Sequence, residues 1–304
     1  MIMTRSGRWH RQHGGEIENM SRIAVTGASG SLGGQVVRLL AEHTDGDVVA
    51  LSRRPTAVPP RVTARIADYA DGGALRNGLP DVDTLVFLSS DGEGTRVLAH
   101  HLNVVAAARA CGVTHIVALS GVDADVDSPF CYAVTNGLTE QAIRDSGCGF
   151  SIVRASIFAE FFRHFLLPAR TTGQLSVPAG DGRIGLVSKG DVGRCLAALA
   201  RCGPTGRCHE VTGPAALDAA AIAATAAQAW VRPVAYRPIS AAAYMAQAAA
   251  TEDPWWLYAY TSMFASIREQ RWDRVTAEVQ HLTGRDPRHL GEILDETTPS
   301  ADAR

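Results

Sequence analysis

The feature that most constrains the fold is a glycine-rich run near the amino terminus, TGASGSLGG. It follows an apolar run at 22–27 and precedes a helical pattern at 31–43. Glycines at Gly27, Gly30 and Gly33 permit a tight turn and a close approach of the backbone to a ligand. Free N–H groups at a helix N-terminus stabilise a pyrophosphate. The run therefore predicts a dinucleotide-binding turn between a first strand and a first helix.

Short β-branched runs alternate with helical patterns through the first half of the chain. This alternation predicts a parallel sheet with crossover helices on both faces. Strands are expected at 22–27, 47–52, 62–67, 83–90, 114–121 and 150–156. Helices are expected near 31–43, 72–78, 95–111 and 133–146. The predicted fold class is α/β, a Rossmann-type doubly wound parallel sheet with a smaller, mostly helical C-terminal substrate lobe.

The chain divides into four predicted segments. Residues 1–19 are polar and basic without an apolar h-region, which predicts a disordered leader and no secretory signal. Residues 20–155 form the expected NAD(P)-binding domain, and 156–298 form a smaller lobe that covers the substrate. HEVTG (209–213) reads as a strand that could return to the main sheet, so the lobe is expected to be interleaved with it. Residues 299–304 are a tail.

Composition excludes several classes of partner. The chain has 29 Lys and Arg against 31 Asp and Glu, without the basic excess that nucleic-acid binding requires. Its longest apolar run, 215–230, is mostly alanine and too weakly hydrophobic to span a bilayer. We therefore expect a small-molecule substrate, no nucleic-acid or membrane partner, and a monomer or homodimer.

The number and spacing of the cysteines indicate the redox compartment. Six cysteines lie scattered in a chain of 304 residues without a CxxC pair, which predicts reduced thiols and a cytoplasmic location. Cys202, Cys208 and His209 have no second ligand pair at finger-like spacing, so no metal site is expected.

The end of the second strand indicates which dinucleotide binds. An acidic residue there would hydrogen-bond the ribose 2′-hydroxyl of NAD, whereas arginine would pair with the 2′-phosphate of NADP. The sequence reads VVALSRRP, which places Arg53 and Arg54 at this position without a carboxylate. NADP(H) is therefore favoured over NAD. Asp68, just after the third strand, could flank the adenine or cap the next segment.

Serines end the fourth and fifth strands. Ser89 and Ser90 follow one strand and Ser120 ends the next. The carboxyl edge of a doubly wound sheet is where its ligands bind, so these hydroxyls could donate to a cofactor or substrate oxygen. Serine also commonly ends strands for structural reasons alone, and that alternative stays open.

Longer segments match a known family pattern. They include AVTGASGSLGGQVV, VVALSRRP, NVVAAARACGVTHIVALSGVDAD and GDGRIGLVSKGDVGRCLAALA. On these motifs the chain resembles the atypical short-chain dehydrogenase/reductase superfamily, and within it the NmrA-like proteins with their NAD(P)H quinone oxidoreductase type 2 branch. The resemblance covers nearly all of 20–295.

The resemblance implies roles for individual residues. It implies a small lobe over the nicotinamide, with pocket walls from Phe158, Phe161, Phe162 and His164. It implies that Arg53 and Arg54 read the phosphate beside a cofactor cradle made of Gly27, Ser29, Gly30, Ser31, Leu32 and Gly33.

The catalytic residues depart from the usual pattern. In typical short-chain reductases a serine orients the carbonyl, a tyrosine protonates it, and a lysine four residues on lowers the pKa of that tyrosine. Ser120 and Tyr132 fit the first two roles, but Asn136 stands in place of the lysine. An amide carries no charge and cannot favour tyrosinate. Lys189 is the only lysine in the chain, so ordinary ketone reduction is disfavoured.

Three functions remain open. The first is an NAD(P)H-dependent oxidoreductase that transfers hydride to a quinone-like, enone or other conjugated small molecule. The second is an NADP-binding redox sensor without turnover. The third is a non-redox dehydratase, epimerase or cyclase of specialised metabolism. His100 and His101 are expected on a solvated helix surface, and Asp191 is expected to pin the start of a helix.

Overall fold

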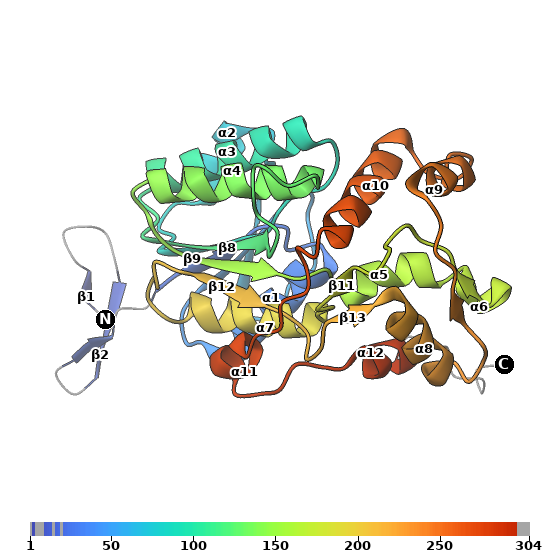
Figure 1. Ribbon diagram of the computed structural model, residues 1–304. Helices are drawn as coiled ribbons and strands as arrows, with labels where there is room; N and C mark the ends of the chain where they lie inside the picture. Colours follow the sequence, from blue (N-terminus) through green and yellow to red (C-terminus); the bar gives the residue numbers. More distant parts are fainter. Residues whose placement is uncertain (1, 4–8, 14–15, 19–20, 297–304) are drawn as a thin grey trace.

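The central sheet determines where the carboxyl ends of the strands lie, and this is the edge at which a ligand is expected to bind. The computed structural model describes residues 2–3, 9–13, 16–18 and 21–296 (Figure 1). In this part of the chain, seven strands lie in the order β12-β9-β8-β7-β4-β5-β6, and every neighbouring pair is parallel. They are β4 (Ile23–Val25), β5 (Val48–Ser52), β6 (Val62–Ile66), β7 (Thr84–Phe87), β8 (His115–Gly121), β9 (Gly149–Ala155) and β12 (Cys208–Val211). The strand order reverses between β4 and β7, which confirms the doubly wound prediction.

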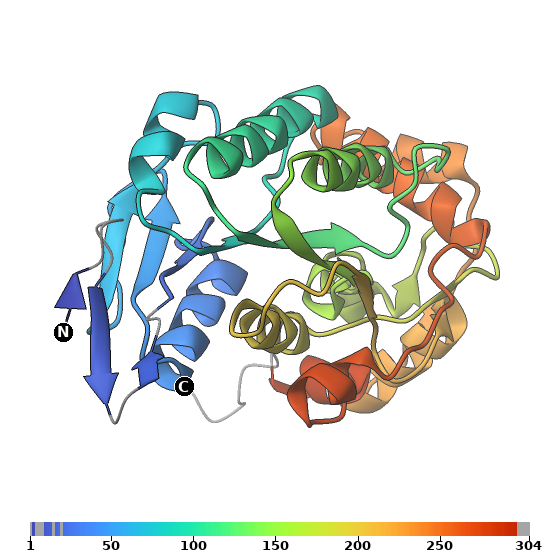
Figure 2. The ribbon, with the colours of Figure 1, turned by 90° about the vertical axis from the view of Figure 1, so that its left-hand side faces the viewer.

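Helices cover both faces of the sheet (Figures 1 and 2). On one face lie α1 (Ser31–His43), α7 (Lys189–Ala200) and α11 (Glu278–Thr283). On the other lie α2 (Gly72–Gly78), α3 (Gly94–Ala110) and α4 (Cys131–Asp145). The helices predicted in the first half are confirmed with small shifts at their ends. Because both faces are covered, β4, β5 and β7 are buried along their whole length and read as continuous apolar runs.

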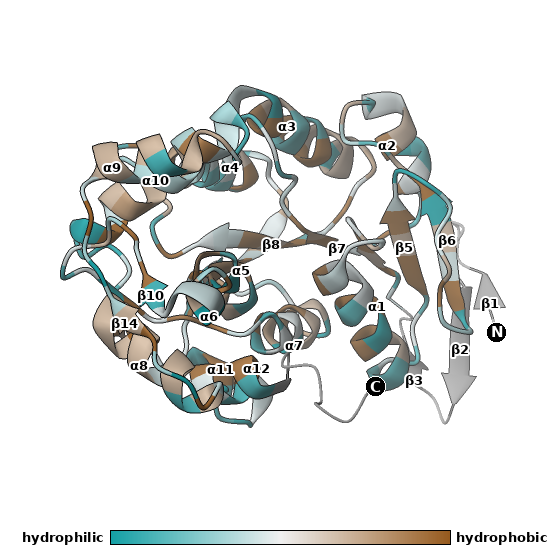
Figure 3. Cartoon of the chain, turned by 90° about the vertical axis from the view of Figure 1, so that its right-hand side faces the viewer, coloured by the Kyte–Doolittle hydropathy of each residue, from teal (hydrophilic) through white to brown (hydrophobic). Residues whose placement is uncertain are grey.

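The remaining elements form a lobe beside the sheet, with the apolar side of α8 visible in Figure 3. Its helices are α5 (Ala159–Leu166), α6 (Ala169–Thr172), α8 (Ala219–Ala229), α9 (Ala241–Ala248), α10 (Pro254–Arg268) and α12 (Leu290–Glu296). Two short strand pairs join them: β10 (Gln174–Leu175) with β14 (Ala235–Tyr236), and β11 (Arg183–Ile184) with β13 (Leu217–Asp218). Phe162, Phe264 and Ile222 are fully buried in one shared core.

The lobe is interleaved with the sheet. The segment predicted as HEVTG forms β12, which pairs in parallel with β9 so that His209 lies opposite Val153. The start of α7 is pinned as expected. Ser188 Oγ accepts from the Asp191 N–H at 2.9 Å and donates to the Asp191 carboxylate at 2.8 Å. The domain division near residue 155 stays a prediction.

The amino-terminal segment has its own strands. β1 (Ile2–Met3), β2 (Trp9–His13) and β3 (Glu16–Glu18) form an antiparallel sheet that no described pairing joins to the main sheet. Short strands thus stand where the sequence predicts a disordered leader. The predicted tail, 299–304, lies outside the described residues. No helix in the described ranges has both the length and the apolar character needed to cross a bilayer.

Candidate active site

The turn between β4 and α1 is built around a close backbone contact. Gly27 has a φ of 61°, in the left-handed region that favours glycine. A Cβ on Gly33 would lie 2.2 Å from the Gly27 carbonyl oxygen, so only glycine lets the helix pack this closely. The Gly30 N–H donates to that same oxygen at 2.9 Å. This geometry fits the backbone approach that a diphosphate requires.

The first turn of α1 leaves donors available for an anion. Gly30 is the N-cap, with no side chain to cap the helix and no acidic residue in the first turn. The N–H groups of Ser31, Leu32 and Gly33 have no intrahelical acceptor. Leu32 buries its side chain in the core, so it can contribute only its backbone. The exposed positions of the cradle are Gly27, Ser29, Gly30 and Ser31.

The two arginines follow β5 as predicted. Both are exposed, and within the described chain neither side chain has a carboxylate partner. Ser52 Oγ donates to the Arg54 carbonyl at 2.5 Å, which fixes the turn that carries them. The charge of Arg53 acts on Tyr69, whose hydroxyl donates to the Leu88 carbonyl at 2.7 Å. Two unpaired guanidiniums beside the switch point fit a 2′-phosphate.

Asp68 closes the turn before α2, and its carbonyl accepts from the N–H of the N-cap residue Asp71 at 3.0 Å. Its Oδ1 accepts from the Ala70 N–H at 2.9 Å, whereas Asp71 is the residue that caps α2. Its predicted place beside the adenine stays a prediction. Asn103 donates to the Tyr69 carbonyl at 2.9 Å and so holds the same loop against α3.

Serines gather where three neighbouring strands end. Ser89 Oγ donates to the Leu119 carbonyl at 3.1 Å, and Ser90 Oγ lies 3.4 Å from His100 Nδ1. With Ser120 and Ser156 they line a cavity of about 290 Å³. Ser156 is 3% exposed, and its Oγ has no hydrogen-bond partner among the described residues. A buried hydroxyl without a partner at this edge is suited to a ligand.

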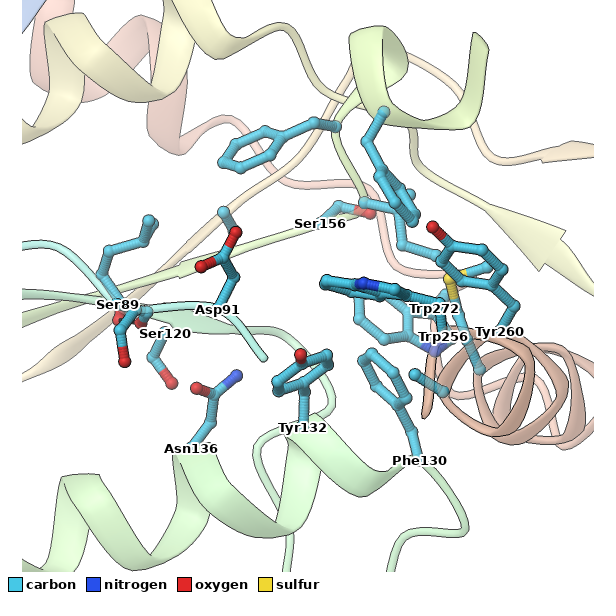
Figure 4. Close-up of a pocket in the computed structure, with 18 residues that line it drawn as sticks. Ser89, Asp91, Ser120, Phe130, Tyr132, Asn136, Ser156, Trp256, Tyr260 and Trp272 are labelled. Carbon is cyan, nitrogen blue, oxygen red and sulfur yellow. Dashed lines mark hydrogen bonds between the residues drawn. The ribbon is translucent and has the colours of Figure 1, made fainter. Parts of the chain in front are cut away.

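The opposite wall of the cavity is aromatic (Figure 4). Helix α10 begins where Asp253 Oδ1 caps the Trp255 N–H at 2.9 Å with Pro254 in the first turn. The rings of Trp256 and Tyr260, which lie one helical turn apart, stack with a distance of 5.8 Å between their centroids. The aromatic residues that line the cavity are Phe130, Tyr132, Phe158, Phe161, Trp256, Tyr260 and Trp272.

Sequence reasoning missed much of this wall. Trp256, Tyr260, Met263 and Trp272 were not predicted, nor were Asp91 and Ser156. The aromatic residues clustered within WWLYAY, at helical spacing, were the available signal for α10. Of the four predicted walls, Phe158 and Phe161 line the cavity.

The other two predicted walls are wrong. Phe162 is fully buried in the core of the lobe, because adjacent residues on a helix point about 100° apart and Phe161 is the one that faces the cavity. His164 lies outside, with its Nε2 3.0 Å from Glu252 Oε1 and its side chain 48% exposed.

Tyr132 lines the cavity, but its hydroxyl is held by hydrogen bonds to the loop after β7 and to α10. It donates to the Gly92 carbonyl at 2.6 Å and accepts from the Gly92 N–H at 3.1 Å and from Trp255 Nε1 at 3.3 Å. Burial raises the pKa of Tyr132 above its ordinary value of 10.0. A tyrosine with a committed proton and a raised pKa is poorly suited to general acid catalysis near neutral pH.

Ser120 is likewise committed. Its Oγ donates to Glu140 Oε1 at 2.7 Å. Glu140 is 1% exposed and accepts from Arg154 at 2.8 and 2.7 Å and from Arg144 at 2.9 Å. Despite the opposing effect of burial, these bonds hold the pKa of Glu140 below its ordinary value, so the carboxylate is ionised. Ser120 therefore offers only lone pairs to a ligand.

Asn136 is the free polar group beside them. It lines the cavity, and its side chain makes no hydrogen bond within the described residues. Lys189 does not replace the missing lysine. Its Nζ lies 5.9 Å from the centroid of the Phe158 ring, and Lys189 is not among the lining residues.

The histidines of α3 correct one prediction. His101 is 1% exposed instead of lying on a solvated surface. Its Nε2 accepts from the Ser90 N–H at 3.2 Å, so Nδ1 carries the proton and donates to Thr139 Oγ1 at 2.9 Å. Burial lowers the pKa of His101 to about 4. The neutral imidazole thus holds the loop that lines the cavity.

Cys208 and His209 are engaged in protein contacts. The Cys208 thiol lies 3.2 Å from Arg144 Nη2, while His209 bonds Thr205 at 2.9 Å and Glu278 at 2.8 Å. Among the residues that the structure describes, no group of three or more metal-ligating side chains is gathered for an ion.

Comparison with known proteins agrees with this geometry. An NAD(P)H-binding family model matches residues 27–202. Quinone oxidoreductase 2 of Escherichia coli is 31% identical over 74% of this chain and 80% of that protein. The (4-alkanoyl-5-oxo-2,5-dihydrofuran-3-yl)methyl phosphate reductase of Streptomyces griseus is 30% identical over 88% of this chain and 94% of that one. The solved E. coli quinone oxidoreductase QOR2 with NADPH superposes with a TM-score of 0.84 at 28% identity, covering 90% and 99% of the two chains.

A family model across more than half of the chain, together with these relatives, defines the class. The chain belongs to the NAD(P)H-binding family, as an oxidoreductase of the NmrA-like atypical short-chain dehydrogenase/reductase type. Within that type it belongs to the quinone oxidoreductase 2-like branch.

Replacing Gly33 by alanine tests the cradle. We expect Gly33→Ala to lower the free energy of unfolding by about 2 kcal/mol and weaken NADPH binding more than tenfold, because the methyl group would overlap the Gly27 carbonyl. Gly34→Ala is the matched control: its Cβ would meet the Ala28 oxygen at 3.3 Å, and alanine favours helix by ~1 kcal/mol. Calorimetry and urea unfolding measure both. Wild-type affinity in Gly33→Ala would contradict the assignment.

The buried histidines predict acid sensitivity. His101 and His115 both have a folded-state pKa of about 4, below the ordinary 6.5, so the unfolded chain binds more protons. Stability should therefore be complete above pH 6.5 and fall as the pH drops toward 4, by about 2 kcal/mol at pH 5 for His101 alone. The free energy of unfolding, measured in urea and plotted against pH, should have a shallower slope in His101→Gln than in the wild type. Some slope should remain, because His115 still contributes. An identical slope would exclude His101 as a cause.

Proposed function

We propose that this chain uses NADPH to reduce conjugated, electron-poor small molecules such as quinones and enones. The observation that carries the proposal is the hydrogen bond that the Tyr132 hydroxyl donates to the Gly92 carbonyl at 2.6 Å. That proton is already used within the protein, and the residue in the usual place of the lysine, Asn136, is neutral. Ketone reduction needs an acid at this position, whereas a conjugated acceptor depends less on one.

The two halves of the chain have different roles: the sheet binds the cofactor and the lobe binds the acceptor. NADPH, when bound, supplies the hydride. The first-turn N–H groups of α1 hold the diphosphate, Arg53 and Arg54 hold the 2′-phosphate, and the serines at the strand ends position the reacting ring. The aromatic wall from α10 binds the acceptor and excludes water from it.

The relatives support this class of acceptor. One is named for quinones, and the other for an oxo-dihydrofuran with an alkanoyl substituent, whose ring double bond is conjugated to a carbonyl group. The direct experiment incubates the purified chain with NADPH and a panel of quinones, enones and simple ketones, following the nicotinamide absorbance. We expect oxidation of NADPH with the conjugated acceptors and none with simple ketones. A cytoplasmic location and a monomeric or homodimeric state stay predictions.

Arg53 should decide the choice of dinucleotide. We expect Arg53→Gln to weaken NADPH binding about 10- to 100-fold, the cost of losing hydrogen bonds to a charged phosphate, with little change for NADH. Arg109→Gln, near the end of α3, is the control for loss of one positive charge. Titration calorimetry with both dinucleotides measures the ratio, and equal losses for the two would contradict the role.

Tyr132 should be dispensable as an acid. We expect Tyr132→Phe to lower kcat for a quinone by less than about fivefold near neutral pH, since the hydroxyl proton already belongs to Gly92. A general acid would be worth about 10²- to 10⁴-fold. Steady-state kinetics across pH distinguishes the two, and a loss of the larger size would return Tyr132 to the mechanism.

A further inference from the structure

Trp272 brings a residue of the lobe to the edge of the sheet. It follows α10 in the chain and lines the cavity, where its ring meets that of Phe130 edge to face with 5.9 Å between the centroids (Figure 4). A Cβ on Gly121, the last residue of β8, would lie 3.9 Å from Cη2 of the indole. The same Cβ would lie 3.2 Å from Asn136 Nδ2. Trp272 and Asn136 therefore both lie over the end of β8, next to Ser120.

The indole of Trp272 is held by a chain of two hydrogen bonds. Its Nε1 donates to Ser266 Oγ at 2.7 Å, and Ser266 Oγ in turn donates to Asp123 Oδ2. Ser266 lies near the end of α10, whereas Asp123 lies in the loop after β8. All three side chains are buried. Because the single hydroxyl proton of Ser266 goes to Asp123, its lone pairs are free to accept from the indole N–H.

Asp123 is itself fixed by further donors. Ser128 Oγ donates to the same Oδ2 at 2.6 Å. Arg271 Nη1 lies 3.4 Å from Asp123 Oδ1 and 2.9 Å from Asp125 Oδ2. Burying a charge costs free energy unless it is paired and hydrogen-bonded, and both conditions are met here. The loop after β8 and the end of α10 are thus joined at one carboxylate, whose two oxygens accept from all of these donors.

We propose that Asp123 is a positioning residue for the acceptor: through Ser266 it fixes the plane of the Trp272 ring, which forms one wall of the acceptor site. The inference deepens the proposed function and rests on it. An indole without its hydrogen-bond partner is free to rotate about its side-chain bonds into the space of the acceptor. The cofactor cradle lies at the start of α1, so the binding of NADPH does not depend on Asp123.

Steady-state kinetics of the whole chain tests this role. The concentration of 1,4-naphthoquinone, a flat neutral acceptor, is varied at saturating NADPH. An amide at position 123 keeps the shape of the side chain but has only one accepting oxygen and no charge. We expect Asp123→Asn to raise the KM for the quinone about fivefold to tenfold and to change kcat by less than about twofold, because the loss falls on acceptor binding. The affinity for NADPH, measured by calorimetry, should equal that of the wild type.

A matched control and a double-mutant cycle separate positioning from a general loss of stability. Asp125→Asn should leave the KM unchanged, because Asp125 pairs with the same arginine but does not line the cavity. Ser266→Ala, which removes the middle of the chain, should reproduce the KM of Asp123→Asn. In a Trp272→Phe background the ring has no N–H to donate, so Asp123→Asn should change the KM by less than about twofold. An equal rise in both backgrounds, or a wild-type KM in Asp123→Asn, would overturn the inference.

Proton exchange at Trp272 tests the chain of hydrogen bonds without turnover. The five tryptophans are labelled with ¹⁵N, and the Trp272 signal is the one that disappears in Trp272→Phe. We expect its Nε1–H to exchange with water at least about tenfold faster in Asp123→Asn than in the wild type, and at the wild-type rate in Asp125→Asn. An unchanged rate in Asp123→Asn, in protein that still reduces the quinone, overturns the inference alone. Wild-type protein that binds NADPH but reduces no conjugated acceptor overturns the proposed function and, with it, the acceptor role of Asp123.

Discussion

The contact between α1 and the turn before it fixes the rest of the site. Gly33 lies so close to the Gly27 carbonyl that no side chain fits between them, and this sets where the first-turn N–H groups of α1 point. β4, which precedes the turn, lies inside the sheet between β5 and β7. The point where the strand order reverses therefore opens directly beside these donors, with the arginines after β5 on one side and the serines after β7 on the other.

The sheet and the lobe contribute different chemistry to the cavity. The strand ends contribute serines: Glu140 fixes the Ser120 proton and a backbone carbonyl fixes that of Ser89, whereas Ser156 Oγ has no partner among the described residues. The lobe contributes an aromatic wall on α10, a helix that Asp253 and Pro254 start at the right place. Hydride transfer needs the acceptor held flat and dry against the reacting ring, and this arrangement supplies position more than acid–base catalysis.

Much of the fold could be predicted because its signals are local. Buried parallel strands read as continuous apolar runs, the helices between them have recognisable starts and ends, and the parallel arrangement brings the serines of successive strands to one edge. The turn and the two arginines were found for the same reason. His101 was misplaced because two adjacent histidines on one helix differ by 100° in direction, and the sequence does not say which one the strand covers.

The hydrogen-bond partners could not be predicted, because they depend on contacts between distant segments. Trp255 donates to Tyr132 across 123 residues, and the role of Tyr132 depends on a loop 40 residues before it. Ser120 and Tyr132 have the residue types and spacing of a catalytic pair. Their hydroxyl protons, however, are donated to Glu140 and to the Gly92 carbonyl, which argues against the catalytic role. These acceptors can be identified only from the three-dimensional structure.

A crystal structure of the chain with NADP⁺ would show whether the cofactor binds against α1. We expect the diphosphate against the N–H groups of residues 31–33, the 2′-phosphate within reach of Arg53, and C4 of the nicotinamide facing the aromatic cavity. A diphosphate bound away from α1, or a nicotinamide ring turned away from that cavity, would contradict it.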